Sequence, residues 1–246
     1  MYDKVWTSDM LPPTHHAHRW MKDFKPYQGS PDQWFGPNTY SCAGEDLMIA
    51  NLFHLMGIER PSYLDIGAHH PFIISNTALL YSRGSRGVNV EANPNLIPAF
   101  LHHRPEDVNV NMGVALAKGT QKFYMWDDGS GRNTFSEEAS KKMAVLTKTI
   151  DLPVTTLNAI VDQYCNGAFP DLLTVDIEGL DFAVLSSAVF YDWSKPKIIC
   201  VEAWLGDDQT SKFVEMMKPN GYSLVCRIAM DLIFIQTELM EKCEQR

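Results

Sequence analysis

Polar side chains recur in this sequence at the points where short apolar segments end. The residues concerned are Asp65, Glu91, Asn111, Asp176, Glu178 and Glu202. In an open parallel sheet the carboxyl ends of the strands meet along one edge, and ligands bind beyond that edge. A sheet that served only as a structural core would not need a carboxylate at each strand end. We therefore expect these residues to line one ligand-binding site.

The turn after the first of these segments reads Gly67-Ala68-His69-His70-Pro71. A glycine there allows a ligand to approach the backbone closely, but one glycine does not make the Gly-x-Gly-x-x-Gly cradle that seats a pyrophosphate. Asp65 suits a cationic amine, and Glu91 suits a ribose diol whose hydroxyls would donate to it. S-adenosylmethionine has a ribose and an ammonium but no phosphate, so we expect this cofactor. In the alternative, both acids are turn and cap residues.

Asp176 and Glu178 are the acids best placed for catalysis. If the strand continues past Asp176, side-chain alternation points both to the same side. One carboxylate could then take a proton from an acceptor hydroxyl while the other holds that hydroxyl in place. Glu202 and His70 are candidate third partners, and such a set of hard ligands would also suit Mg²⁺ or Mn²⁺. In the alternative, Asp176 binds the ammonium of the cofactor and Glu178 caps the following helix.

Three further polar segments could contact ligands. Asn111-Met112-Gly113 follows the third strand, where an asparagine or the backbone could read the amino group of an adenine, although an ordinary turn fits the segment almost as well. The polar loop at 127–134 lacks the acidic spacing of a calcium loop; we interpret it as an acceptor-side lid, with Asn133 and Thr134 as candidate contacts, or as a plain surface loop. His15-His16-x-His18 does not favour zinc, because neighbouring histidines cannot easily converge on one ion.

Strand-like and helix-like segments alternate from Gly44 onward, which predicts an α/β fold with a doubly wound, mostly parallel sheet. Strands are expected at Tyr63–Ala68, Gly87–Glu91, Val108–Asn111, Leu172–Asp176, Ile198–Glu202, Tyr222–Arg227 and Leu232–Thr237; helices are expected at Glu45–Gly57, Thr77–Ser82, Asn95–His103, Leu157–Tyr164, Phe182–Ala188 and Ser211–Met217. The last two strands are so close in sequence that one must be antiparallel, and we place it at the sheet edge. Lys122–Trp126 and Val154–Thr156 are expected as an inserted hairpin or a pair of extra strands.

Composition limits the possible partners. The 246 residues include 21 Lys and Arg against 30 Asp and Glu, a formal charge of −9, which disfavours nucleic acid and anionic membrane surfaces as partners. No apolar run approaches the roughly 20 residues of a membrane span, and the first residues do not resemble a signal peptide. The five scattered cysteines suit a reducing cytoplasm rather than a disulfide scaffold. We divide the chain into an extension at 1–40 that covers the site or forms a homo-oligomer contact, a main domain at 41–238, and a tail at 239–246.

The sequence resembles the FkbM-type S-adenosylmethionine-dependent methyltransferases over about Tyr40 to Glu202. The stretches that carry the resemblance, in order and with similar spacing, are Tyr40–Asp46, Leu64–Pro71, Ser75-Asn76-Thr77, Gly87–Pro94, Arg104–Asp107 and Val175–Gly179. The chain departs from the family pattern in two places. It has His69-His70-Pro71 where the family often has Asn, a small residue and Gly, and it has Cys42 where relatives commonly show Gln.

The resemblance implies the class I, Rossmann-like methyltransferase fold with a seven-stranded sheet. It also implies O-methylation of sugars or of polyketide-like hydroxyls, with a small-molecule or glycan acceptor. Asp176, Glu178 and His70 are then the expected catalytic residues. The expected cofactor-binding residues are Asp65, Gly67, Ala68, Asn76, Glu91, Ala92, Asn111 and Asp176. A nicotinamide-dependent oxidoreductase and a non-catalytic S-adenosylmethionine-binding module are the alternatives.

Overall fold

The computed structural model describes residues 39–141, 146–203 and 207–244. The expected N-terminal extension up to residue 38, including the three histidines, lies outside the described residues. A seven-stranded sheet forms the centre of the described part. Its strands, in spatial order, are β3 (Val108–Asn111), β2 (Gly87–Glu91), β1 (Tyr63–Ile66), β7 (Leu172–Val175), β8 (Ile198–Glu202), β10 (Asp231–Gln236) and β9 (Tyr222–Ile228). The seven strands expected from the sequence are therefore confirmed.

The position predicted for the antiparallel strand is wrong. β10 is antiparallel both to β8 and to β9, so it lies second from the edge, and β9 is the edge strand. After β8 the chain passes through α8 (Asp207–Met217) and then forms β9, which lies two positions away from β8 in the sheet and runs in the same direction. The short turn after Ile228 then leads into β10, which lies between β8 and β9.

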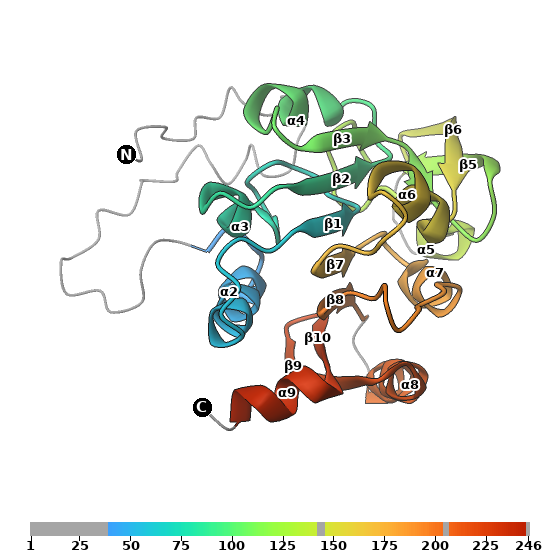
Figure 1. Cartoon of the computed structure of the whole chain (residues 1–246). Helices are drawn as coiled ribbons and strands as arrows, with labels where there is room; N and C mark the ends of the chain where they lie inside the picture. Colours follow the sequence, from blue (N-terminus) through green and yellow to red (C-terminus); the bar gives the residue numbers. More distant parts are fainter. Residues whose placement is uncertain (1–38, 142–145, 204–206, 245–246) are drawn as a thin grey trace.

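Helices cover both faces of the sheet, as Figure 1 shows, because successive residues of each buried strand point to opposite faces. On one face, α2 (Glu45–Leu55) and α3 (Ala78–Ser82) pack with Tyr63, Leu172 and Ile198. The other face packs against α6 (Leu157–Tyr164), α7 (Asp181–Ser186) and α8. The remaining helices are α4 (Ile97–His103), α5 (Glu137–Lys141), the 3₁₀ turn η2 (Lys218–Asn220) and α9 (Thr237–Glu244). The expected tail from residue 239 thus continues α9.

A small second sheet is inserted between β3 and α6. It consists of β4 (Gly113–Val114), β5 (Gly119–Met125) and β6 (Lys148–Thr155), and β5 is antiparallel to β6, which confirms the expected pair of extra strands. Thr156 ends the insertion and caps α6, since its hydroxyl accepts a hydrogen bond of 3.2 Å from the N–H of Ala159. The insertion follows the carboxyl end of β3, so it carries its connecting loop to the same edge as the predicted site (Figure 1).

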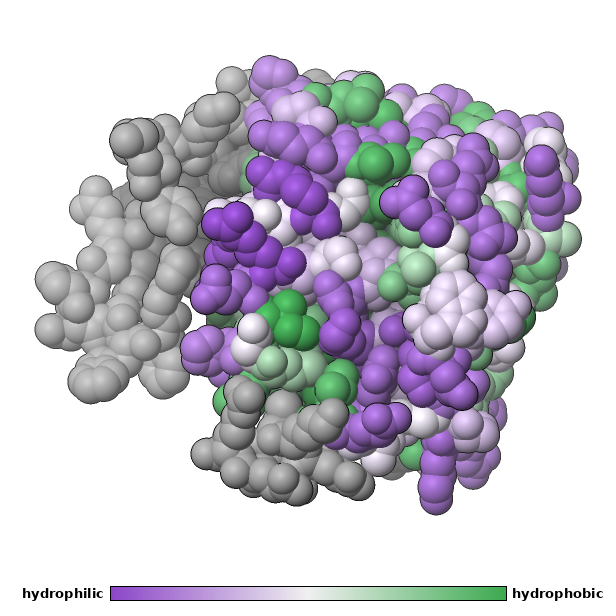
Figure 2. Space-filling model, in the orientation of Figure 1, coloured by the Kyte–Doolittle hydropathy of each residue, from purple (hydrophilic) through white to green (hydrophobic). Residues whose placement is uncertain are grey.

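The outer surface is mainly polar on the face seen in Figure 2, where the hydrophobic residues lie in small separate groups. The large apolar side chains are mostly buried on the two faces of the sheet. Among the described residues, none of the helices combines the length and the apolar character that crossing a bilayer requires. This surface is typical of a domain whose apolar residues have been used for its core.

Candidate active site

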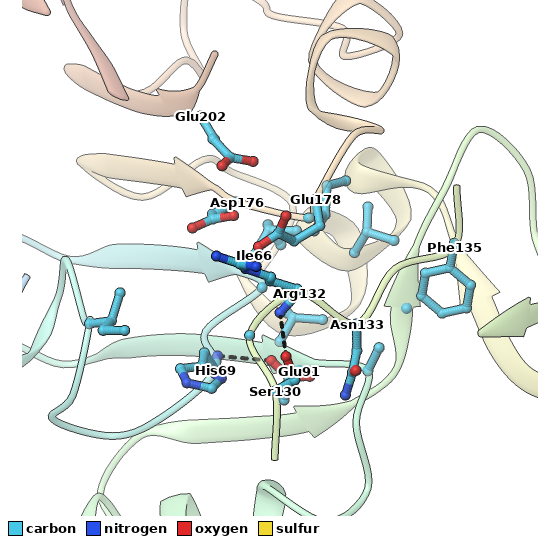
Figure 3. Close-up of a pocket in the computed structure, with 18 of the residues that line it drawn as sticks. Ile66, His69, Glu91, Ser130, Arg132, Asn133, Phe135, Asp176, Glu178 and Glu202 are labelled. Carbon is cyan, nitrogen blue, oxygen red and sulfur yellow. Dashed lines mark hydrogen bonds between the residues drawn. The ribbon is translucent and has the colours of Figure 1, made fainter. Parts of the chain in front are cut away.

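A cleft of about 280 Å³ lies at the carboxyl ends of β1, β2, β7 and β8. Several of the residues named for the predicted site line it directly, among them Gly67, Glu91, Asp176, Glu178 and Glu202. Figure 3 shows Asp176, Glu178 and Glu202 on one wall, with His69 and Glu91 across from them. The prediction that polar residues at neighbouring strand ends meet in one place is correct for these side chains.

Gly67 forms the floor of the cleft and needs to be glycine. Its φ is +82°, and a Cβ built on it would lie 1.7 Å from the carbonyl oxygen of Asp176. The N–H groups of Gly67 and Ala68 both donate to the carbonyl oxygen of Val90, and the N–H of Asp176 donates to the carbonyl of Ile66. These bonds hold the turn after β1 between β2 and β7, so a ligand above Gly67 can touch the backbone.

Glu91 ends β2 and holds the loops around it. Its two carboxylate oxygens accept backbone N–H bonds from His69 (2.8 Å) and Asn93 (2.6 Å). Burial raises the pKa of Glu91 to about 7, although these bonds act in the opposite direction. Each oxygen retains a lone pair, so the carboxylate can still accept a hydrogen bond from a ligand hydroxyl in the cleft.

Asp65 is not a lining residue of the cleft. It shares the face of Tyr63 and accepts a 2.6 Å hydrogen bond from the hydroxyl of Thr77. The hydroxyl oxygen of Thr77 also accepts hydrogen bonds from both terminal nitrogens of Arg104. Arg104 is fully buried, and its Nε lies 2.8 Å from a carboxylate oxygen of Asp107. Burial raises the pKa of Asp65 to about 6. The expectation that Asp65 contacts the cofactor is therefore corrected: its carboxyl belongs to an internal polar network behind β1.

His70 is also placed away from the cleft. It is fully buried, and its Nδ1 accepts backbone N–H bonds from Phe72 (3.2 Å) and Ile73 (3.1 Å). The ring therefore shapes the turn after Pro71, and the expectation of a catalytic His70 is corrected. Its neighbour His69 lies in the left-handed region, with φ +53°, and lines the cleft instead. Two adjacent residues in a turn can point in opposite directions, which the sequence does not reveal.

The other expected cofactor residues divide into two groups. Asn76 and Ala92 line the cleft, and Asn76 donates to the hydroxyl of Thr174 at 3.3 Å. Ala68 is buried beneath the turn and is not a lining residue. Asn111 uses its side-chain amide to donate to the carbonyl oxygens of Glu91 (2.8 Å) and Ala92 (3.0 Å). It supports the loop after β2, while its neighbour Met112 reaches the cleft.

Asp176 and Glu178 both face the cleft, but not through strand alternation. β7 ends at Val175, and Glu178 has a positive φ of +58°. Burial and the surrounding carboxylates raise the pKa of Asp176 well above its usual range. Burial also raises the pKa of Glu178 to about 7, and the guanidinium of Arg132 acts against that shift. Glu178 therefore changes protonation near neutral pH, as a general base requires.

The polar loop at 127–134 is hydrogen-bonded to the segment that carries Glu178. The hydroxyl of Thr134 donates to the carbonyl oxygen of Glu178 at 2.7 Å, and Thr134 is bridged to Tyr124 of β5. Asn133 lines the cleft and uses its side chain to bond Trp126 N–H (2.8 Å) and the carbonyl of Asp127 (2.9 Å). Asn133 is thus at the expected place, and Thr134 positions the loop that carries it.

A family model described as the methyltransferase FkbM domain matches residues 65–224. The match begins in β1 and ends in β9, so it includes the strands that form the cleft.

The chain belongs to the FkbM methyltransferase family.

A comparison with curated proteins found no match. The resemblance read from the separate sequence stretches is confirmed, and the match extends beyond Glu202 into the final strand pair.

Sequence reasoning missed several residues of the site in this FkbM domain. Arg132, Asp181 and Asp231 all act on the charge of the cleft. Asp181 could have been found, because it is an acid directly before the helix expected at Phe182–Ala188, and an acid there suits the N-terminus of a helix. Arg132 stands in an irregular loop, where no period indicates which way a side chain points. Asp231 lies one residue before the strand expected at Leu232–Thr237, and the structure places it in β10.

Proposed function

We propose that this FkbM domain transfers a methyl group from S-adenosylmethionine to a hydroxyl of a sugar, glycan or related small-molecule acceptor. The observation that carries the proposal is the joint placement of three features in one cleft. They are a floor that excludes any Cβ at Gly67, a buried acceptor at Glu91, and an acid near neutral pKa at Glu178. Family membership supports methyl transfer in general, and the finer assignment is ours.

The residues of the cleft fit the proposed cofactor chemically. Gly67 leaves space for close approach to the backbone, and Glu91 suits the ribose hydroxyls. Met112 and Phe135 offer apolar surface to a base. When bound, S-adenosylmethionine supplies a methyl group on a positively charged sulfur: the acceptor oxygen bonds to that carbon, the carbon–sulfur bond breaks with its electron pair kept by sulfur, and the hydroxyl proton needs a base.

Glu178 is the residue that we assign to that proton. Its carboxylate is partly buried, its pKa is about 7, and Arg132 favours its ionised form. A base with a pKa near the working pH combines a useful ionised fraction with a real driving force for proton transfer. Thr134 fixes the backbone at Glu178 and so holds the base in place relative to the floor at Gly67. Much of the rate should come from this positioning.

The acceptor class rests on the polar character of the loop side of the cleft. Ser130, Arg132 and Asn133 line it together with Glu178 and Glu202. Such a wall can bind several hydroxyls, whereas a purely apolar acceptor would displace water from Arg132 and Glu178 without replacing its hydrogen bonds. A hydroxyl-rich acceptor therefore suits this side better than an apolar one.

Two measurements test the proposal. Calorimetric titration with S-adenosylmethionine and with NAD should show binding of the first and none of the second; the opposite result would favour an oxidoreductase. The domain should then be incubated with a deuterium-labelled methyl donor and a panel of monosaccharides and oligosaccharides, and the products weighed by mass spectrometry. A labelled methyl ether is the expected product.

Glu178→Gln separates the enzyme from a binding module. We expect turnover, measured as release of S-adenosylhomocysteine, to fall about 100-fold or more, with donor affinity within about threefold of the wild type. Glu59→Gln is the matched control, because Glu59 is exposed and away from the cleft. Equal turnover in Glu178→Gln and the control would exclude Glu178 as the base.

A further inference from the structure

Three carboxylates form a row across the carboxyl edge of the sheet. Val175 at the end of β7 is the register partner of Val201, so Asp176, directly after β7, lies beside Glu202, the last residue of β8. Glu202 is in turn the direct partner of Asp231 on β10. Residues at one level of neighbouring strands project from the same face. We call Asp176, Glu202 and Asp231 the acid row.

Asp181 brings a fourth carboxylate to this row from the start of α7. One oxygen from each of Asp176, Asp181 and Glu202 lies within 4.8 Å of the other two. Asp181 and Glu202 are 3% and 4% exposed, respectively. The N–H groups of Ile177 and Gly179 bond the two oxygens of Asp181, at 2.8 and 2.9 Å. Its carboxylate is therefore held in a fixed orientation toward the other two.

An arrangement of this kind is unfavourable while all of its carboxyl groups are ionised. Like charges directly opposite one another on neighbouring strands destabilise a sheet. The four charged neighbours that act most strongly on Asp176 are all carboxylates: Glu202, Glu178, Asp181 and Asp231.

Glu45 is an independent indication that a cation belongs here. It begins α2, which packs on the face from which the acid row projects, and it is fully buried. One of its oxygens accepts the N–H of Ala43 at 2.8 Å. The other, Oε1, has no hydrogen-bond partner among the residues that the structure describes. Its charge acts on Asp231, the outer member of the row. A buried carboxylate oxygen that has no hydrogen-bond donor and whose charge acts on another acid favours positive charge nearby.

We propose that Asp176, Asp181 and Glu202 bind one divalent metal ion, Mg²⁺ or Mn²⁺, with Asp231 and Glu45 adding negative charge around it. Carboxylate oxygens at this separation are the hard ligands that these ions prefer. The ligand set differs from the one expected from the sequence. Glu178 faces Arg132 and His70 lies outside the cleft, whereas Asp181 is added.

The metal would stand beside Glu178 at the acceptor end of the cleft. Resting on the proposed function, a hydroxyl bound there would become more acidic, so that its proton passes to Glu178 as the oxygen forms its bond to the methyl carbon and the carbon–sulfur bond breaks. The products are a methyl ether, the neutral thioether and one proton. The site itself does not depend on this chemistry, so it can be tested without turnover.

The test uses Mn²⁺ alone with the full-length protein. Bound Mn²⁺ loses the sharp electron paramagnetic resonance lines of the free ion, so a titration counts sites and gives their affinity. We expect one saturable site, unchanged when S-adenosylmethionine is added, and at least tenfold weaker in Glu202→Gln and in Asp176→Asn. Glu59→Gln removes the same charge from an exposed position and should bind as the wild type does. Circular dichroism melting establishes that each variant is folded.

Each outcome decides one question. No loss of free Mn²⁺ signal up to about 5 mM metal would overturn the metal site and leave the methyltransferase proposal intact. Competition between Mn²⁺ and S-adenosylmethionine would also overturn it, because the acid row would then bind the ammonium of the cofactor. Equal weakening in Glu59→Gln would show unspecific binding and overturn it as well. Tight Mn²⁺ binding by a protein that does not bind S-adenosylmethionine would support the site and refute the proposed function.

Discussion

Gly67→Ala is the sharpest test of how the cleft is built. A methyl group at this position would lie 1.7 Å from the carbonyl oxygen of Asp176 and 3.2 Å from the side chain of Ile177. The contact distance for carbon and oxygen is well over 3 Å, so the turn after β1 and the loop after β7 must separate by more than an ångström. That movement would strain the hydrogen bond from Asp176 N–H to the carbonyl of Ile66, which joins the two strand ends at 2.9 Å.

Two costs add in this variant. The φ of +82° at residue 67 costs a residue with a Cβ roughly 1–2 kcal/mol, and forced overpacking typically costs about 1–3 kcal/mol. We therefore expect the free energy of unfolding to fall by about 2–5 kcal/mol. The affinity for S-adenosylmethionine should fall at least about tenfold, because the same methyl group enters the floor of the cleft.

Gly57→Ala is the control that separates the two costs. Gly57 also has a positive φ, +73°, but a Cβ there would meet nothing within 4 Å. Urea unfolding of the two variants should show Gly57→Ala losing roughly 1–2 kcal/mol and Gly67→Ala clearly more. Calorimetric titration should show normal cofactor binding in Gly57→Ala. Equal stability of the two variants, with unchanged binding in both, would refute the claim that the floor excludes a side chain.

Two further predictions concern charge. Burial raises the pKa of Asp65 to about 6, above about 4 in the unfolded chain, so ionisation of this group opposes folding and its cost appears as the pH rises between those values. Relative to Asp65→Asn, the free energy of unfolding of the wild type should fall by about 2–3 kcal/mol between pH 4 and pH 7, as measured by urea unfolding. Asp65→Asn should bind S-adenosylmethionine normally. A tenfold loss of binding would show that Asp65 does contact the cofactor. Arg132→Gln removes the cation that lowers the pKa of Glu178, so the acidic limb of the kcat/KM profile should move to higher pH; an unmoved limb would exclude Glu178 as the titrating base.

The fold was predictable because its signals are local. Apolar segments such as Leu172–Val175 and Ile198–Glu202 are short, bounded and separated by helical patterns, which is enough to predict a parallel sheet. The place of β10 was not predictable in the same way. Its antiparallel direction follows from a short turn, but which neighbour it pairs with on its other side depends on where the connection through α8 returns the chain.

The site was predicted in part for the same reason. Strand ends are periodic, so Glu91, Asp176 and Glu202 could be placed on one edge from their positions alone. Side chains in turns follow no period. His69 therefore lines the cleft where His70 was expected, and Met112 lines it where Asn111 was expected.

The sequence by itself determined the alternation of strands and helices, the acids at the strand ends and the membership in a family, because each is written in local pattern and order. Tertiary structure decided which of those acids meet. Asp65 turns to Thr77 and its polar network outside the cleft, whereas Asp231, 55 residues beyond Asp176, comes to lie in the same row through strand register. Register and the packing of loops depend on contacts between distant segments, and no single segment contains that information.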